Sequence, residues 1–208
     1  MNHEYSVLGG INRARIGQII GTIAAAVSSA LVALLLALVD VANALGFGHV
    51  VPTVLLPPIG AGIVFAALYW LFDRHVWKHP WLSQGLGVPD LSGRWCVQGQ
   101  TINPDKTKGY AWEGTISIVQ SWDRLRVRLK TSQSGSNSVT AALVRDEADG
   151  FRLFYSYKND PKVDQPELHS HRGYAEIVFA PDLKSAEGEY FNGLGRFTFG
   201  TMNLTKEA

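Results

Sequence analysis

The residues best suited to bind a small ligand gather near the C-terminal end of the chain, in EYFNGLGRFTFGTM at residues 189–202. One basic residue, Arg196, stands there between aromatic stretches interrupted by glycine. A guanidinium costs free energy to bury unless it is paired, and it forms bidentate hydrogen bonds with phosphate. We interpret Arg196 as a candidate anchor for an anionic ligand. The alternative is that it lies at a rim, extends into water and covers the neighbouring aromatic rings.

Aromatic and amide side chains elsewhere in the second half of the chain could complete such a site. Aromatic rings stack on nucleobases with about 1 to 3 kcal/mol each, and the amides of Asn159 and Asn192 could read base edges. The candidate ligand-binding residues are Trp112, Thr131, Tyr157, Asn159, His171, Tyr190, Asn192, Arg196 and Thr198.

Catalytic and metal-binding patterns are weak in comparison. His169 and His171 share one face of an extended segment, but no further Cys, His or Asp completes a metal-ligand set. Glu187 and Glu189 alternate outward in the expected register, which disfavours a carboxylate pair for acid/base chemistry. The sequence has neither a phosphate-binding glycine loop nor a nucleophile elbow. We therefore expect no catalytic residue, no metal and no cofactor, and we expect that the protein is not an enzyme.

The candidate residues lie on segments whose apolar residues alternate with period two, the pattern of strands. No helical pattern intervenes, so we predict an all-β domain at residues 90–208, an eight-stranded up-and-down antiparallel barrel similar in architecture to lipocalins and streptavidin. The expected strands are 91–100, 110–120, 124–133, 138–145, 151–159, 169–179, 185–193 and 196–205.

Alternation also predicts the two ends of this barrel. The inward positions at one end are apolar and should form a plug: Trp95, Leu125, Leu143, Leu153, Phe179 and Met202. The candidate ligand-binding residues fall at the other end, which should open away from the membrane. Arg126, Arg128 and Lys130 share the outward face of one strand, which we interpret as a solvated surface; an anion site is the alternative.

The N-terminal part of the chain has the composition of a membrane domain. Between residues 16 and 72 the only formal charge is Asp40. Apolar runs at 16–39 and 50–72 are each long enough to cross a bilayer of roughly 30 Å, although Pro52, Pro57 and Pro58 should kink the second. We predict a membrane domain at 1–80 with two transmembrane helices and a linker at 81–89. A signal peptide and a buried helical hairpin are the alternatives for these runs.

The distribution of charge indicates where the two parts lie. Arginine and lysine flank the outer ends of the two apolar runs, and the connector DVANALGFGH has none, so both chain ends should face the cytoplasm. Residues 88–208 carry fifteen basic and fifteen acidic residues, a balance that argues against binding of long nucleic acid. The single cysteine, Cys96, permits no internal disulfide.

Two membrane segments, a short linker, DLSGRW opening the β domain and GEYFNGLGRFTFGTMNL closing it together resemble the two-transmembrane, β-strand-rich effectors of bacterial CBASS anti-phage signalling. The resemblance implies that the barrel binds a cyclic dinucleotide or related cyclic oligonucleotide, made by a partner nucleotidyltransferase of the CD-NTase type. It further implies that the chain lies in the bacterial inner membrane, that it forms homo-oligomers on binding, and that it then disrupts the lipid membrane and kills the infected cell.

Two other functions compete with this one. The opening Gly93-Arg94-Trp95 is similar to that of lipocalin-like barrels, so the chain could be a membrane-tethered module that binds an apolar small molecule or lipid. It could also be a constitutive membrane assembly in which the barrel only oligomerises. An apolar lumen would favour the first, and toxicity without ligand would favour the second.

Overall fold

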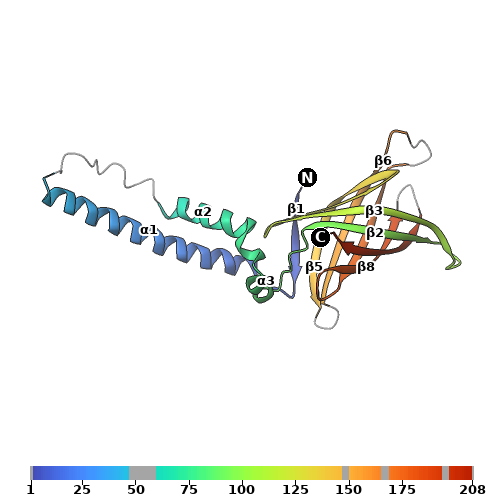
Figure 1. Cartoon of the computed structure of the whole chain (residues 1–208), viewed down its shortest axis with the longest axis horizontal. Helices are drawn as coiled ribbons and strands as arrows, with labels where there is room; N and C mark the ends of the chain where they lie inside the picture. Colours follow the sequence, from blue (N-terminus) through green and yellow to red (C-terminus); the bar gives the residue numbers. More distant parts are fainter. Residues whose placement is uncertain (1, 47–59, 147–149, 165–168, 194–196, 208) are drawn as a thin grey trace. The chain divides into compact units, whose positions relative to one another are not determined.

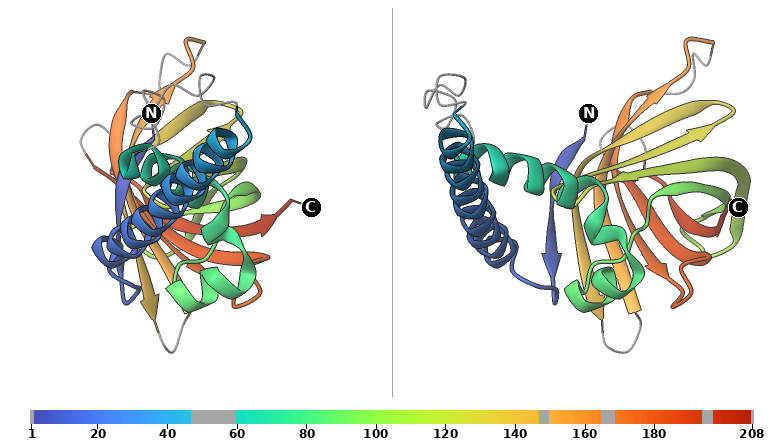
Figure 2. Two further views of the ribbon diagram at one scale, coloured as in Figure 1. Left: turned by 90° about the vertical axis from the view of Figure 1, so that its left-hand side faces the viewer. Right: turned by 60° about the vertical axis from the view of Figure 1, so that its left-hand side comes forward.

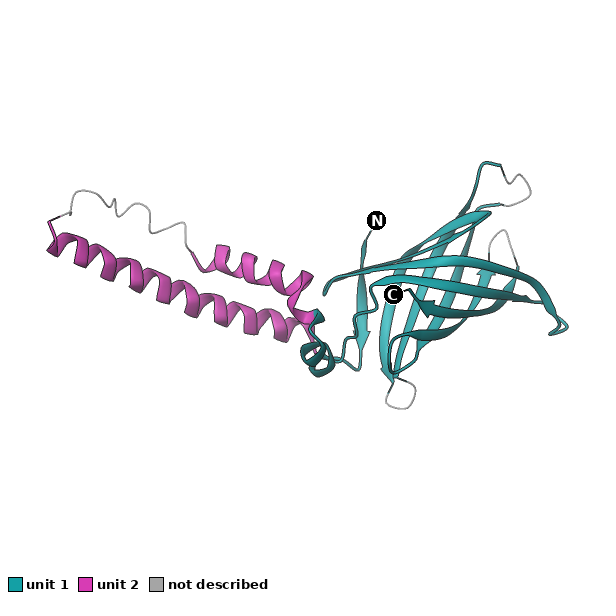
Figure 3. Ribbon diagram, in the orientation of Figure 1, with its two compact units in different colours: residues 1–10, 78–208 teal, residues 11–77 magenta. Residues whose placement is uncertain are grey.

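The computed structural model describes residues 2–46, 60–146, 150–164, 169–193 and 197–207. The chain divides into two compact units, one of residues 11–77 and one of residues 1–10 with 78–208 (Figure 3). The first unit is helical and the second contains every described strand. Each unit is described below by itself.

The helical unit contains one long apolar helix and one shorter one. Helix α1, Arg13–Ala44, has 32 residues and measures about 48 Å at 1.5 Å per residue, more than the bilayer core requires. It starts where the Asn12 side chain accepts a hydrogen bond from the backbone N–H of Ala14 at 2.9 Å. Its buried residues are spaced by four, on one face: Ile16, Ile20, Ala24 and Ser28. The first predicted span therefore lies within an apolar helix of sufficient length.

The second predicted span, 50–72, is described only in part. Helix α2, Ala61–Arg74, has 14 residues, which is too short by itself to cross a bilayer. Residues 47–59, with Pro52, Pro57 and Pro58, lie outside the described residues. The second membrane crossing therefore stays a prediction. A 3-10 turn η3 at Val76–Lys78 and helix α3 at Pro80–Leu86 follow in the chain.

The second unit is a sheet of nine strands that closes on itself (Figures 1 and 2). The strands are β1 His3–Leu8, β2 Gly93–Ile102, β3 Lys108–Gln120, β4 Arg124–Thr131, β5 Ser134–Asp146, β6 Gly150–Pro161, β7 His171–Phe179, β8 Ser185–Gly193 and β9 Phe199–Lys206. From β2 to β9 each strand pairs antiparallel with the next, and β9 pairs with β2. The all-β prediction is confirmed, and each of the eight expected segments overlaps one of these strands.

The predicted number of eight strands is wrong for the described chain, because residues near the N-terminus add a ninth, β1. Strands β4 and β5 pair only at Arg128–Lys130 with Gly135–Asn137. Beyond these pairs β1 lies between the two strands, antiparallel to β4 and parallel to β5. The sequence of β1, HEYSVL, has only six residues and is followed by a long apolar run. Nothing in it indicates that it pairs with strands more than a hundred residues away.

Two polar side-chain contacts hold β1 in place, one of them buried. Tyr5 is 3 % exposed, and its hydroxyl accepts a hydrogen bond from Gln120 Nε2 at 3.1 Å. Gln120 Oε1 in turn accepts from the backbone N–H of Leu91 at 2.8 Å. His3, also on β1, places its Nε2 atom 2.6 Å from Ser138 Oγ of β5. Side chains of β1 thus contact β3 and β5, while its backbone pairs with β4 and β5.

The inward side chains at one end of the barrel form a dry core, as alternation predicted. Trp95 and Phe179 pack edge to face with ring centres 5.2 Å apart, and Trp95 Nε1 donates to the Leu91 carbonyl at 3.2 Å. All six residues of the expected plug are buried: Trp95, Leu125, Leu143, Leu153, Phe179 and Met202. The remaining inward positions, together with Met202 of the plug, line a cavity at the other end.

Candidate ligand-binding site

Three aromatic rings of the predicted site lie against glycines of neighbouring strands. The ring of Trp112 covers Gly99, where a Cβ atom would lie 2.0 Å from the indole. Tyr157 covers Gly173 in the same way, with a Cβ at 2.4 Å from its Cζ. Since no L side chain fits beneath these rings, the glycines allow the rings to lie along the barrel wall. The rings therefore line the interior without filling it.

The third such ring, Tyr190, belongs to a hydrogen-bonded cluster with its neighbours. A Cβ at Gly200 would lie 2.8 Å from the Tyr190 hydroxyl and 2.1 Å from the backbone oxygen of Gln100. The Tyr190 hydroxyl accepts from Trp112 Nε1 at 3.1 Å and lies 3.2 Å from Thr101 Oγ1. The Trp112 and Tyr190 rings meet edge to face at 5.8 Å. These contacts fix both rings in one orientation.

A second cluster joins Tyr157, Asn192 and Thr198. The Tyr157 hydroxyl donates to Asn192 Oδ1 at 2.8 Å, and Asn192 Nδ2 donates to Thr198 Oγ1 at 2.8 Å. The backbone N–H of Asn192 also donates to the carbonyl of Thr198 at 2.7 Å. Both functional atoms of the Asn192 amide therefore have a partner within the protein.

Asn159 and His171 differ, because they keep hydrogen-bonding capacity for a ligand. The two residues are cross-strand partners, and each is 7 % exposed. His171 Nδ1 lies 3.0 Å from the carbonyl oxygen of His169, so Nδ1 carries the proton and Nε2 of the neutral ring is an acceptor. Among the described residues the Asn159 side-chain amide has no hydrogen-bond partner. Buried polar groups in proteins are usually paired, so this pair is a candidate for ligand recognition.

These residues surround one cavity that encloses about 840 Å³ of unfilled space, counting the part that is open to solvent. Eight of the nine predicted site residues line it: Trp112, Thr131, Tyr157, Asn159, His171, Tyr190, Asn192 and Thr198. Arg196, the ninth, lies outside the described residues. Thr131 also has a structural role, because its hydroxyl accepts a hydrogen bond from the backbone N–H of Ser134 at 3.0 Å across the β4–β5 turn.

Sequence reasoning missed part of the lining. The β4–β5 turn contributes Ser132 and Gln133, and the start of β5 contributes Ser134 and Ser136. The wall further includes Thr101, Tyr110, Glu113, Leu129, Tyr155, Ala175 and Met202. Burial raises the pKa of Tyr155 well above its usual range, so its hydroxyl stays neutral in the lumen. Among the described lining residues Glu113 is the only carboxylate, and none is lysine or arginine. An anionic ligand would therefore meet mainly neutral donors there.

The described residues show no group of three or more His, Cys, Asp or Glu side chains able to hold a metal ion. Glu187 and Glu189 are exposed on the outside of β8, away from the cavity. What the cavity offers is a set of ring faces and hydrogen-bonding groups suited to binding a flat, polar ligand.

Comparison with known proteins gives three matches. A family model described as the Cap15 cyclic dinucleotide receptor domain matches residues 86–206. A second model, described as the Cap15 TM helices, matches residues 14–78. A protein of Yersinia aleksiciae named CD-NTase-associated protein 15 is 42% identical over 205 residues, which cover 99% of this chain and 97% of that protein.

Proposed function

The chain belongs to the Cap15 family of CBASS effectors, and on this premise we propose that it is a membrane-anchored receptor and effector in one chain. Its β unit binds a cyclic dinucleotide, or a related cyclic oligonucleotide, in the cavity described above. The observation that carries the proposal is the cavity lining, in which three oriented aromatic rings stand beside the buried polar pair Asn159 and His171.

The nucleobases of the ligand would stack on ring faces. Trp112, Tyr157 and Tyr190 are held by hydrogen bonds through their polar edges, and one face of each ring lies against a glycine of the barrel wall. The opposite face of each ring is the one proposed to stack on a base. Asn159 offers a donor and an acceptor, and His171 Nε2 offers an acceptor, so the pair can read the edge of one base. An apolar metabolite would leave these two buried groups without partners, at a cost of about 1 to 3 kcal/mol for each.

The phosphates of the ligand require positive charge, and Arg196 is the residue proposed to supply it. Among the described lining residues none is lysine or arginine, and Glu113 is acidic. A single guanidinium that pairs with phosphate would account for the one basic residue of the aromatic segment at 189–202. Arg196 is therefore the proposed anchor of the ligand, and its removal should reduce ligand affinity more than the removal of any other proposed contact.

The effector step follows from the apolar N-terminal segments. Ligand binding would favour an assembled state of the protein to the extent that the ligand binds this state more tightly. Assembly of several copies would gather their membrane segments and disrupt the inner membrane, which kills the infected cell. In this proposal the chain crosses the membrane twice, both of its ends face the cytoplasm, and a CD-NTase-type nucleotidyltransferase makes the ligand.

The proposal is tested by calorimetry on the full chain in detergent micelles, with a panel of cyclic di- and trinucleotides. We expect at least one member to bind, and we expect Arg196→Ala to weaken that binding by about 30-fold or more, the equivalent of about 2 kcal/mol for a lost charged contact. Arg172→Ala is the matched control, because it removes the same charge from the exposed outer face of β7. The control should stay within about threefold of the unmodified chain.

Two outcomes would contradict the proposal. If a folded protein binds no member of the panel but binds a fatty acid or another apolar molecule, the lipocalin-like function is the better account. If Arg196→Ala and Arg172→Ala bind with equal affinity, the ligand is a nucleotide but Arg196 is not its anchor.

A further inference from the structure

The outer face of the barrel carries a row of apolar side chains on adjacent strands. In register order it contains Tyr174 on β7, Phe191 on β8, Phe199 on β9 and Ile102 on β2, and we name it the aromatic row. Phe191 is 55 % exposed and Phe199 is 42 % exposed. Outward positions of a soluble barrel are usually polar, so a contiguous exposed apolar row indicates a binding surface.

The aromatic row forms one side of a shallow groove with acidic residues beside it. The Tyr174 and Phe191 rings lie 5.5 Å apart, and the groove also includes Glu176, Glu189 and Thr201. Glu176 is paired with Arg152. Glu189 and its neighbour on the same face, Glu187, are exposed and make no ion pair with another described residue. This surface would thus attract a partner with several cations.

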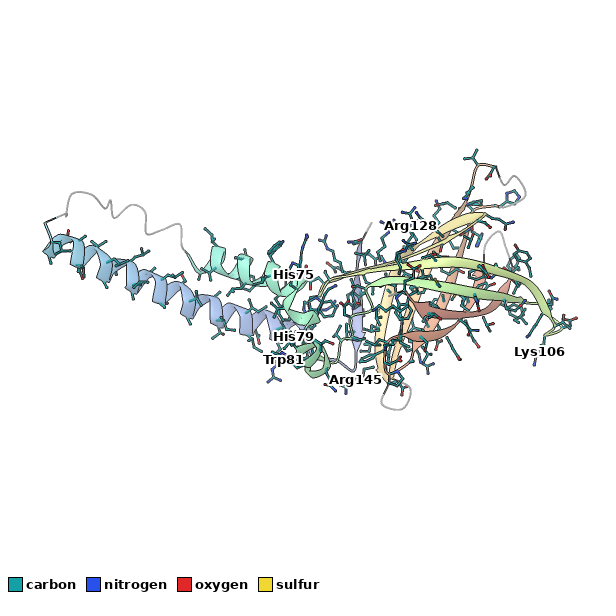
Figure 4. The ribbon with its side chains drawn as sticks, viewed as in Figure 1. His75, His79, Trp81, Lys106, Arg128 and Arg145 are labelled. Atoms are coloured by element: carbon teal, nitrogen blue, oxygen red, sulfur yellow. The ribbon has the colours of Figure 1, made fainter. Side chains whose placement is uncertain are left out.

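The same barrel carries such a set of cations on strand β4. Its outward residues are Arg124, Arg126, Arg128 and Lys130, and the register neighbours of Arg128 are uncharged (Ser117 on β3 and Asn137 on β5). Figure 4 labels Arg128 on this face. Among these four, the described residues provide a side-chain partner for Arg126 only, in the amide oxygen of Asn137. We name this surface the basic face.

The two surfaces lie on opposite sides of the barrel. In the strand order, β4 and β8 are separated by β3, β2 and β9 in one direction and by β5, β6 and β7 in the other, with β1 additionally between β4 and β5. A surface that pairs with a different surface on the next copy makes a head-to-tail contact, and such contacts can repeat indefinitely. Arginine also packs well on aromatic rings while it pairs with carboxylates.

We propose that the aromatic row, with Glu187 and Glu189, binds the basic face of a second copy of this chain, so that the barrels assemble head to tail. An anionic lipid surface is a poorer occupant, because the unpaired carboxylates would be repelled by it. The inference rests on the proposed function in one respect: it locates the contact through which the proposed assembly occurs.

The first test is chemical cross-linking of the full chain in detergent micelles, in a Cys96→Ser background. Thr201→Cys places a thiol beside the aromatic row, and Ser117→Cys places one beside the basic face, without removing a proposed contact. Bismaleimides of two spacer lengths are added with and without the cyclic dinucleotide panel. The chain with both cysteines should form a ladder of dimers, trimers and larger species. Each chain with only one of the two cysteines should give no cross-linked species. A mixture of the Thr201→Cys chain and the Ser117→Cys chain should give cross-linked dimers and nothing larger.

The second test reverses the charges. Glu187→Lys with Glu189→Lys should reduce species beyond the monomer at least tenfold, and Arg128→Glu with Lys130→Glu should do the same. A mixture of the two variants should assemble again, because each now presents the face that the other lacks. Asp164→Lys, on an exposed loop outside both faces, is the control and should assemble normally.

The outcomes separate this inference from the proposed function. Calorimetry should show that the charge-reversed variants still bind the ligand, because neither surface faces the cavity. Their apparent affinity should be lower than that of the unmodified chain, because the ligand binds the assembled state more tightly. A ladder that forms although no nucleotide binds would support the contact and contradict the proposed ligand. The contact itself is overturned if the chain with both cysteines forms no ladder under any condition. It is also overturned if Thr201→Cys alone gives dimers, which would indicate two-fold pairing.

Discussion

Replacing Gly173 by alanine should disturb the wall of the cavity more than its small size suggests. The added Cβ would lie 2.4 Å from both Cζ and the hydroxyl oxygen of Tyr157 and 2.7 Å from the backbone oxygen of Phe191. The tyrosine ring must therefore move, and the hydrogen bond from its hydroxyl to Asn192, now 2.8 Å, is lost or lengthened. Because the backbone oxygen is also too close, movement of the ring alone cannot relieve the contact.

The size of the effect follows from these two contributions. Overpacking costs about 1 to 3 kcal/mol, and the lost hydrogen bond about 0.5 to 1.5 kcal/mol. A total near 3 kcal/mol lowers the melting temperature by roughly 6 to 12 °C for a chain of this length. If Tyr157 forms the ligand wall, ligand affinity should fall about tenfold or more as well.

Thermal unfolding of the full chain in detergent, followed by tryptophan fluorescence, measures the first effect. The matched control is Gly193→Ala in β8, where an added Cβ would meet no atom of a described residue within 4 Å. The control should change stability by less than about 0.5 kcal/mol. Equal melting temperatures for the two variants would refute the close approach of Tyr157 to Gly173 on which the described wall depends.

Three further predictions concern residues outside this wall. Tyr5→Phe removes the hydroxyl that accepts from Gln120 and should lower the melting temperature by about 2 to 4 °C, for about 1 kcal/mol; an unchanged value would mean that β1 is not held by this bond. Burial raises the pKa of Tyr155, so the unfolded chain ionises first and the free energy of unfolding should fall above about pH 10, by up to about 1.4 kcal/mol per pH unit. Denaturant titrations should show a weaker fall in Tyr155→Phe, and an equal fall would contradict burial. The hydrogen bond to Glu207 raises the pKa of Cys96, so alkylation of this thiol at pH 8 should be faster in Glu207→Gln; a slower or equal rate would contradict the contact.

The sequence predicts the antiparallel strands and their faces well because alternation is a local signal. Trp95 and Phe179 are far apart in the chain, yet the period of two places both on the inner face, and the structure buries both. The same rule brings Trp112, Tyr157 and Tyr190 to one cavity. Residues that belong to one face can thus be found without knowledge of the register between strands.

The features that could not be predicted from the sequence are those that depend on the register between strands. Gly99 lies beneath Trp112, and Gly173 beneath Tyr157, only because these residues are cross-strand partners. A glycine at an inward position opposite an aromatic residue is a usable signal once strand pairing is known. Strand β1 could not be predicted for the same reason, since its partners lie at Leu125 and at residues 141–144.

The placement of β1 has a consequence for the order in which the protein is made. This strand leaves the ribosome before the other described strands, and α1 begins at Arg13, five residues after β1 ends at Leu8. Both strands that flank β1 are synthesised more than a hundred residues later. Contacts between such distant segments form late in folding. A fusion attached directly before His3 would lie next to the strand whose pairing forms late. A tag is therefore better placed after Lys206, the last residue of β9.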